Sequence, residues 1–116
     1  QVYRFDADGY MRTGWVFEQG SWYYHAPSGA QATGWVLDGV SWYYLTPGTG
    51  QMATGWVKDG SHWYYLNPAN GKMKTGWHYE NGSWYYLKPG SGQMATGRLW
   101  ILWKYYRFSD NGMLIR

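Results

Sequence analysis

The stretch TGWVLDGVSWYYL, residues 33–45, decides the fold of this chain. Its two ends, Trp35-Val36-Leu37 and Trp42-Tyr43-Tyr44, are rich in aromatic and branched side chains, which favour β-strands. Between them lies Asp38-Gly39, and Asp-Gly readily adopts the positive φ angles of tight hairpin turns. The stretch therefore predicts a β-hairpin of two short strands.

The same pattern recurs along the chain. Thr-Gly-Trp begins at residues 13, 33, 54 and 75, Thr-Gly-Arg follows at residue 96, and Trp-Tyr-Tyr begins at residues 22, 42, 63 and 84. Self-similarity at a nearly fixed period indicates a repeat architecture. One isolated hairpin is marginally stable in water, so the hairpins must bury their faces jointly by stacking. The sequence therefore predicts an all-β solenoid of about five stacked β-hairpins without a closed core.

The repeats set the domain organisation. We expect a single repeat domain over residues 1–116, with hairpins starting near residues 13, 33, 54 and 75. Residues 96–116 are a divergent terminal repeat, and residues 1–12 are the remnant of a preceding one. Because Gln1 stands in mid-pattern, we expect a mature or trimmed fragment, which hides any export signal.

Composition narrows the function classes. Aromatic residues make up 22% of the chain, while charged residues make up 15% and the net charge is +3. The basic residues are scattered, which does not indicate nucleic-acid binding. With no cysteine there is no disulfide framework, and no apolar run approaches the length of a membrane span, so membrane insertion is not expected.

The repeated aromatics divide into two groups. Successive strand residues point to opposite faces, so Trp42 and Tyr44 share a face and Tyr43 takes the other. A packed core would accept aliphatic residues of similar volume, yet tryptophan recurs at both motif positions through four copies. We therefore expect the tryptophans and the last tyrosines to face a ligand. The middle tyrosines are expected in the core: Tyr23, Tyr43, Tyr64 and Tyr85.

A set of two tryptophans and a tyrosine suits a quaternary ammonium group, which is attracted to several ring faces at once. A sugar is the alternative, because it also stacks on aromatic rings. Sugars need polar partners beside the rings, however, and the acidic residues here stand mostly at turn tips. The cation is therefore the favoured ligand.

The motif Gly-Trp, then Trp-Tyr-Tyr, then Gly-x-Met-x-Thr-Gly-Trp resembles the choline-binding repeat of pneumococcal and phage cell-wall proteins. The resemblance covers nearly the whole chain. It implies a left-handed superhelix of hairpins, with sites for choline or phosphocholine between consecutive hairpins. It also implies attachment to choline-bearing teichoic and lipoteichoic acids at the extracellular surface of a bacterial cell wall. No cofactor or metal is implied.

In that family two tryptophans come from one hairpin and a tyrosine from the next, with a methionine near the linker. Carried onto this chain, the resemblance implies three sites: Trp15, Trp22 and Tyr44, beside Gln31; Trp35, Trp42 and Tyr65 with Met52; and Trp56, Trp63 and Tyr86 with Met73. The last tyrosine is chosen because it shares a face with the tryptophan of its own strand. If the hairpin is rotated, the middle tyrosine takes its place.

A fourth site, of Trp77, Trp84 and Met94, is expected to be impaired. Its third wall would be Arg107, whose guanidinium would repel a bound cation. Next to it the apolar run 99–103, LWILW, replaces the usual polar turn. Two interpretations stay open for this run, a hydrophobic cap over the last hairpin or a contact for a partner, such as a second copy in a homodimer.

No catalytic constellation is evident, so we expect a non-enzymatic module. His25, His62 and His78 have no metal-ligand spacing and are expected to be solvated strand residues. The family resemblance often implies a fused enzyme or effector, which residues 1–116 do not include. Two further functions remain as alternatives, a glucan- or polysaccharide-binding repeat and a scaffold that spaces or dimerises other domains.

Overall fold

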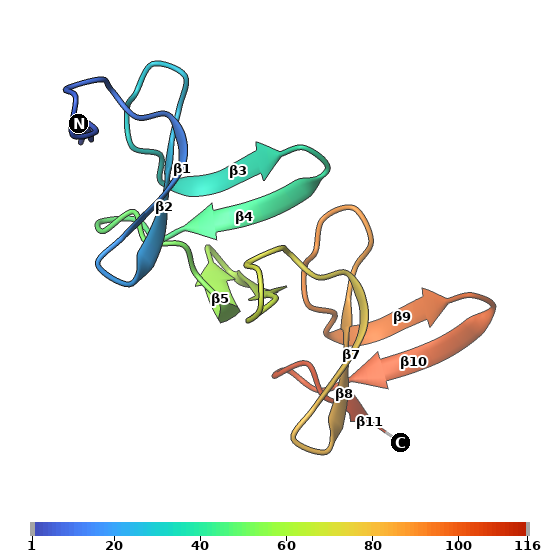
Figure 1. Cartoon of the computed structure of the whole chain (residues 1–116). Helices are drawn as coiled ribbons and strands as arrows, with labels where there is room; N and C mark the ends of the chain where they lie inside the picture. The colour runs from blue at the N-terminus through green and yellow to red at the C-terminus, as the bar shows by residue number, and fades with distance from the viewer. Residues whose placement is uncertain (1, 116) are drawn as a thin grey trace.

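The computed structural model describes residues 2–115 and contains eleven β-strands and no helix in that range. Five hairpins follow one another along the chain, and a short strand ends the series (Figure 1). The strands are β1 (Gly14–Glu18), β2 (Ser21–His25), β3 (Gly34–Asp38), β4 (Ser41–Leu45), β5 (Gly55–Asp59), β6 (His62–Leu66), β7 (Gly76–Glu80), β8 (Ser83–Leu87), β9 (Gly97–Ile101), β10 (Lys104–Phe108) and β11 (Leu114–Ile115).

Each hairpin is antiparallel and in the register that its turn predicts. In the second hairpin Gly34 pairs with Leu45 and Asp38 with Ser41, and the other hairpins repeat this register. The terminal hairpin differs because β11 adds to β10 and makes a three-stranded sheet. Its turn also differs: Leu102 and Trp103 adopt φ angles of 45° and 72°, which side chains other than glycine and asparagine rarely adopt.

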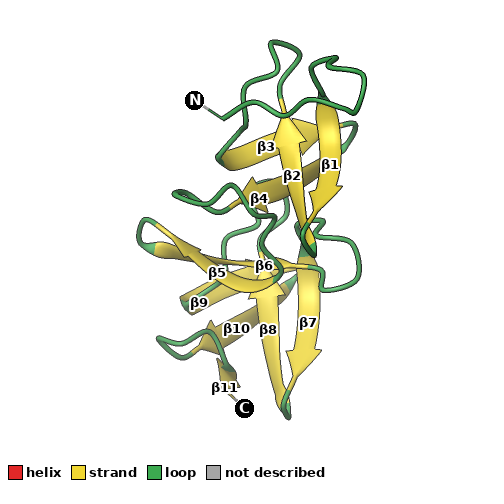
Figure 2. Cartoon of the chain, turned by 60° about the vertical axis from the view of Figure 1, so that its left-hand side comes forward, coloured by secondary structure: helices red, strands yellow, loops and turns green. Residues whose placement is uncertain are grey.

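The hairpins stack into a rod with principal extents of 58 × 24 × 22 Å. Successive hairpins are turned about the long axis, so that β1–β2 and β7–β8 run alike, as do β3–β4 and β9–β10 (Figures 1 and 2). The stacking brings the hairpins together without closing a barrel among residues 2–115. The predicted all-β stack of five hairpins is confirmed.

The core of the rod is a line of buried side chains along its length, with one contributed by the end of each hairpin's second strand. The last residue of each second strand points inward, and Leu45, Leu66 and Leu87 are completely buried. The row ends differently at each side, with His25 in the first hairpin and Phe108 in the terminal one. At the terminal end Phe108 forms a cluster with Ala95 and Ile101. Every repeat thus buries a small share of a continuous core, as solenoid stability requires.

The linkers tie each repeat to the one before it. The backbone N–H of Met52 donates to the carbonyl of Trp22 at 2.8 Å, and Met73 and Met94 repeat this bond one and two hairpins later. The side chain of Met52 lies against Gly71, where a Cβ atom would stand 2.5 Å from its sulfur. Gly71 has a φ of 78°, so both space and backbone require glycine there.

Two of the three histidines contradict the prediction that they are solvated. His25 and His78 are buried, whereas His62 is exposed. His25 occupies the position of the buried leucines at the end of the second strand, and its Nδ1 lies 2.8 Å from the carbonyl oxygen of Gly29. His78 stands where the first three hairpins have valine and the terminal one has leucine. Burial is tolerated because both rings find polar partners.

Candidate functional site

The hairpins stack with the tryptophan face of one against the opposite face of the next. Trp15 lies across the hairpin from Tyr24 and on the same face as Trp22, at a centroid distance of 6.4 Å. Tyr43 comes from the other face of the following hairpin and meets Trp15 edge-on at 4.8 Å. Trp15 is therefore packed between tyrosines of two hairpins, which fixes its ring.

This stacking forms four aromatic pockets, here called cages, along the rod. Each is lined by two tryptophans of one hairpin, the middle tyrosine of the next and a residue of the next linker. The first cage is Trp15, Trp22, Tyr43 and Met52; the second is Trp35, Trp42, Tyr64 and Met73; the third is Trp56, Trp63, Tyr85 and Met94; and the fourth is Trp77, Trp84, Tyr106 and Leu114. All eight tryptophans predicted from the motif line a cage.

The predicted third wall is corrected by the structure. Tyr44, Tyr65 and Tyr86 do not line the cages, and Tyr44 and Tyr65 are buried. Tyr44 instead packs on Trp35 of its own hairpin, at 4.9 Å. The prediction failed because a residue on the tryptophan face of one hairpin faces forward, whereas the preceding hairpin meets its back. The middle tyrosine, the alternative left open, is the one that reaches the cage.

The methionines are displaced by one repeat from their predicted cages. Met52 was expected in the second cage, Met73 in the third and Met94 in the fourth, but they line the first, second and third. The reason is the backbone hydrogen bond described above. The linker that leaves the second hairpin bonds to Trp22 of the first hairpin, and the later linkers repeat this offset. Gln31 accordingly lies outside the first cage, which has a methionine after all.

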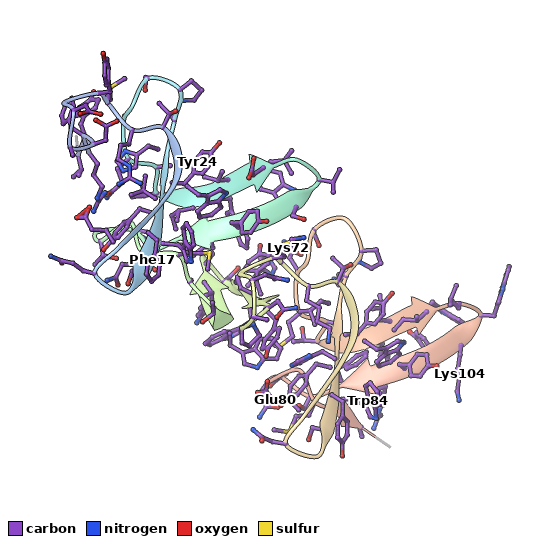
Figure 3. The ribbon with its side chains drawn as sticks, in the orientation of Figure 1. Phe17, Tyr24, Lys72, Glu80, Trp84 and Lys104 are labelled. Carbon is purple, nitrogen blue, oxygen red and sulfur yellow. The ribbon has the colours of Figure 1, made fainter. Side chains whose placement is uncertain are left out.

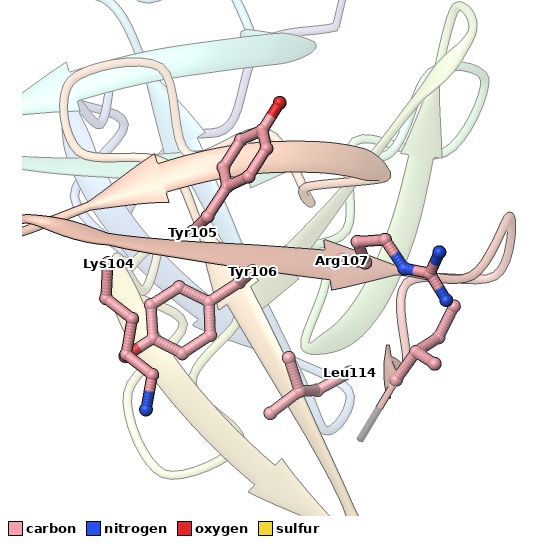
Figure 4. A pocket seen from close by; sticks show the side chains of 6 residues that line it. Lys104, Tyr105, Tyr106, Arg107 and Leu114 are labelled. Atoms are coloured by element: carbon pink, nitrogen blue, oxygen red, sulfur yellow. The ribbon is translucent and has the colours of Figure 1, made fainter.

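The fourth cage has three aromatic walls, contrary to the prediction that Arg107 would form one of them. Tyr106 aligns with Tyr85, the middle tyrosine of the preceding hairpin, and lies 5.1 Å from Trp77. Figure 4 shows Tyr106 and Leu114 on one side of β10 and Tyr105 on the other. Arg107 is exposed and does not line this cage. Among the two tryptophans, the tyrosine and the linker residue that define a cage, the fourth cage therefore differs from the others by leucine in place of methionine.

The strand-one tryptophans of the first three cages are also held by hydrogen bonds that cross between hairpins. The indole Nε1–H of Trp15 donates to Asp38 at 2.9 Å and that of Trp35 donates to Asp59 at 2.9 Å. The indole of Trp56 donates to Glu80 at 3.1 Å. These acids were predicted only as turn residues. Their recurrence 23 or 24 residues after each tryptophan was a sequence feature that could have revealed the contact.

Of these acids, Glu80 accepts two side-chain hydrogen bonds. Its Oε1 accepts a hydrogen bond from Nε2 of His78 at 3.1 Å, and its Oε2 accepts the one from Trp56. The bond from His78 is the main reason that the pKa of Glu80 is lowered, against partial burial, with the bond from Trp56 adding to it. Burial and the neighbouring Glu80 charge raise the pKa of Tyr65 in turn, and burial and Asp59 raise that of Tyr44.

At the N-terminal end Arg4 has the sequence position of the last tyrosine of a repeat, but it meets the first hairpin as a strand-one tryptophan meets the next one. Its guanidinium lies 4.0 Å from the ring centroid of Tyr23 and its Nε donates to Glu18 at 3.0 Å. It also donates to Gln31 and approaches Nε2 of His25 at 3.0 Å. Because a guanidinium can only donate, His25 accepts at Nε2 and carries its proton on Nδ1. Arginine thus repeats both contacts of the cage tryptophans.

Among residues 2–115, no three His, Cys, Asp or Glu side chains come together as metal ligands would. The same residues include no helix that could cross a membrane. The aromatic cages are therefore the candidate site of this part of the chain.

Known proteins share both the motif and the architecture. The family model of the choline-binding repeat matches residues 19–54 and 53–99. Choline binding protein F from Streptococcus pneumoniae is 43% identical with a TM-score of 0.91, over 97% of this chain and 38% of that one. CbpJ from Streptococcus pneumoniae TIGR4 is 43% identical with a TM-score of 0.93, over 97% of this chain and 39% of that one.

A more distant relative is the pneumococcal cell wall endolysin from phage Cp-1, whose structure was solved in complex with choline. It is 33% identical with a TM-score of 0.65, over 98% of this chain and 36% of the endolysin. The chain thus spans well under half the length of each of these proteins. No curated protein sequence matches it. The repeat match and the shared stack of hairpins together show that this chain belongs to the choline-binding repeat family.

Proposed function

We propose that this chain binds choline and phosphocholine, with one quaternary ammonium group in each of the four cages. The observation that carries the proposal is the fourfold recurrence of two tryptophans and a tyrosine around one pocket. A trimethylammonium group has no N–H to donate, so it is recognised by ring faces and apolar contact rather than by conventional hydrogen bonds. A flexible methionine or a leucine completes the apolar lining.

The partner that suits this arrangement is a polymer carrying many choline groups. Each ring contributes about 0.5 to 2 kcal/mol, so a cage of three rings binds with roughly millimolar affinity. Four such cages on one rod hold a multivalent ligand far more tightly than any one of them. We therefore propose choline-bearing teichoic and lipoteichoic acids as partners, at the extracellular bacterial cell wall. The module attaches a larger protein there and performs no chemistry itself.

The sugar-binding alternative is less well supported by the contacts around the cages. Asp38 and Asp59, the acids nearest the first two cages, already accept hydrogen bonds from tryptophan indoles. They are therefore committed to joining the hairpins rather than to binding hydroxyl groups. A sugar would need such polar partners to fix its orientation.

Choline titration followed by tryptophan fluorescence and by thermal melting tests the proposal. Binding to the native state alone raises the melting temperature with ligand concentration. Trp42→Ala should reduce both the retention on a quaternary-amine resin and the choline-induced shift, because Trp42 lines the second cage. Val40→Ala is the control, since Val40 is 98% exposed in the neighbouring turn. A melting temperature that stays constant at saturating choline would refute choline binding.

We further propose that the exposed part of the terminal run contacts a second copy of the chain. Leu99 and Ile101 of this run pack in the apolar cluster between the terminal hairpin and the preceding one, whereas Leu102 and Trp103 are 88% and 96% exposed. These two residues, both at positive φ, place two apolar side chains in the turn, whereas each of the other four turns carries at most one, Val40 in the second hairpin.

Replacing Leu102 by Asn and Trp103 by Gly copies the turn of the preceding hairpin and isolates this contact. The variant should remain folded, because asparagine and glycine accept positive φ angles more readily. Sedimentation equilibrium should show a dimer for the natural chain and a monomer for the variant. Identical sedimentation of the two proteins would contradict the homodimer proposal and leave choline binding untouched.

A further inference from the structure

The third cage differs from the other three because a carboxylate lines it. Glu80 is part of its wall, together with Asn111 and Met113 of the last linker. Asp38 and Asp59 take the corresponding position in the preceding hairpins, but they do not line the first and second cages. Glutamate has one methylene more than aspartate. In the fourth cage the corresponding residue is Ile101, which carries no charge.

The Glu80 carboxylate is held in place by two donors. Trp56, itself a cage wall, donates to Oε2, and His78 donates to Oε1. These donors keep the group ionised at neutral pH, because they lower its pKa. The negative charge is therefore fixed beside the cavity before any ligand arrives.

The positive charges near this carboxylate are separated from the cavity. Lys74 contacts the network, and its Nζ lies 3.0 Å from Nδ1 of His78, on the far side of the imidazole from Glu80. An ammonium group can only donate, so in this arrangement His78 accepts at Nδ1 and donates through Nε2. Neither residue lines the third cage. The carboxylate thus faces the pocket without a cation between them.

We propose that Glu80 is a specificity-determining residue that makes the third cage the tightest of the four for a quaternary ammonium ligand. The inference rests on the proposed choline binding and adds which cage is filled first and why. Ring faces alone attract a trimethylammonium group and also its neutral carbon analogue, which has the same shape. A carboxylate attracts only the charged one. The Glu80 side chain is 32% exposed, so added salt should weaken this preference.

A comparison of choline with 3,3-dimethylbutan-1-ol, its neutral analogue, tests the proposal in the full chain. The indole N–H resonance of Trp63 reports on the third cage and that of Trp42 on the second. The indoles that donate to acids at these cages are those of Trp56 and Trp35 instead. For Glu80→Gln we expect choline binding at the third cage to weaken about tenfold, which corresponds to roughly 1.4 kcal/mol. Binding of the neutral analogue there should change less than twofold.

Two further variants complete the design. Asp59→Asn is the matched control, because Asp59 also accepts a tryptophan indole but does not line the second cage. Choline binding at that cage should change less than twofold. Glu80→Asp keeps the charge and withdraws it by one methylene, so it should give an intermediate loss. It also serves if Glu80→Gln proves poorly folded.

The outcomes separate this inference from the proposed function. If Glu80→Gln weakens both ligands equally, Glu80 only positions Trp56, and the specificity role is overturned. If the natural chain fills all four cages at the same choline concentration and Glu80→Gln changes nothing, the inference fails while choline binding stands. If choline perturbs no cage resonance in the natural chain, the proposed function itself is wrong.

Discussion

The third and fourth cages each have two tryptophans and a tyrosine as walls, but different interactions hold the tryptophan of the first strand in place. Trp56 donates its indole N–H to Glu80, whereas the residue equivalent to Glu80 beside Trp77 is the buried Ile101. Trp77 packs on the terminal apolar cluster instead, with the ring of Phe108 at 6.0 Å. The comparison teaches that stacking between hairpins specifies the shape of a cage, while the anchor of the ring can be polar or apolar.

The two ends of the rod also differ from its middle in what holds the ring or its replacement. At the C-terminal end an apolar cluster replaces the acid, and at the N-terminal end a guanidinium replaces the tryptophan. Terminal repeats of a solenoid lack one neighbour, so their interactions must differ from those inside. Arg4 makes the contacts with a tyrosine and an acid that a tryptophan makes elsewhere. At the other end the buried Ile101 occupies the position of the acid.

The largest effect is expected when the terminal hairpin is given an acid at the position that Asp38, Asp59 and Glu80 occupy in the preceding hairpins. Ile101→Asp supplies an acid near Trp77 but places it inside the cluster with Ala95 and Phe108. Loss of apolar burial and an unpaired buried carboxylate should together destabilise the chain by roughly 3 kcal/mol or more. Urea unfolding checks this, with Asp59→Ile as the reciprocal change at a half-exposed position. Equal stability of Ile101→Asp and the natural chain would show that the two anchors are interchangeable.

A smaller loss is expected at the N-terminal joint. Arg4→Met keeps an aliphatic side chain but removes the guanidinium, and Nε2 of the buried His25 loses its donor. An unpaired buried acceptor costs about 1 to 3 kcal/mol. Thermal melting should show the loss, whereas Arg12→Met should melt like the natural chain because Arg12 is exposed. If both variants melt alike, Arg4 contributes nothing as a substitute for tryptophan.

A pair of tryptophan replacements measures the polar anchor directly. Trp56→Phe removes an indole N–H that donates to Glu80, and Trp77→Phe removes one beside Ile101, where no acid stands. Both lose similar ring area. Trp56→Phe should therefore lower the free energy of unfolding by about 0.5 to 1.5 kcal/mol more than Trp77→Phe does, which is the usual net contribution of one hydrogen bond. A difference in unfolding free energy near zero would mean that the indole bond is not stabilising.

The smallest effect concerns pH. The folded chain lowers the pKa of Glu80 below its reference value of 4.5, chiefly through the bond from His78. Glu80 thus contributes stability above about pH 4.5, and that contribution is lost as the pH falls through its lowered pKa. Melting curves of Glu80→Gln and the natural chain should differ at pH 7 and converge toward pH 3. A gap that widens on acidification would reverse the sign of this linkage.

The sequence reveals the hairpins because their determinants are local. Strand residues, turn glycines and the 20- or 21-residue period all lie within one repeat, and the tryptophans of every cage follow from the same motif. The closing tyrosine could not be settled this way. The choice between Tyr43 and Tyr44 depends on whether hairpins meet front to front or front to back, which is a property of the stack.

The remaining features also depend on contacts between repeats. Met52 reaches the first cage because its backbone bonds to Trp22, and no pattern within one repeat predicts that bond. The joint between Trp56 and Glu80 spans 24 residues and becomes visible only when repeats are aligned with an offset. The burial of His25 follows from its repeat position, which leucine occupies in the next three hairpins.

The register of the hairpins has a mechanical consequence. Because Gly34 pairs with Leu45, the chain enters and leaves the second hairpin at the same end, and every other hairpin repeats this arrangement. Tension applied to the two termini therefore peels the cross-strand hydrogen bonds one pair at a time, like a zipper, instead of shearing them all together. The extended length of a repeat of about 21 residues is close to 70 Å, at about 3.3 to 3.6 Å per residue, so each hairpin that opens lengthens the chain by that amount less the share of the rod it occupied. Under load the rod yields hairpin by hairpin at low force, and the hairpins still stacked keep their cages.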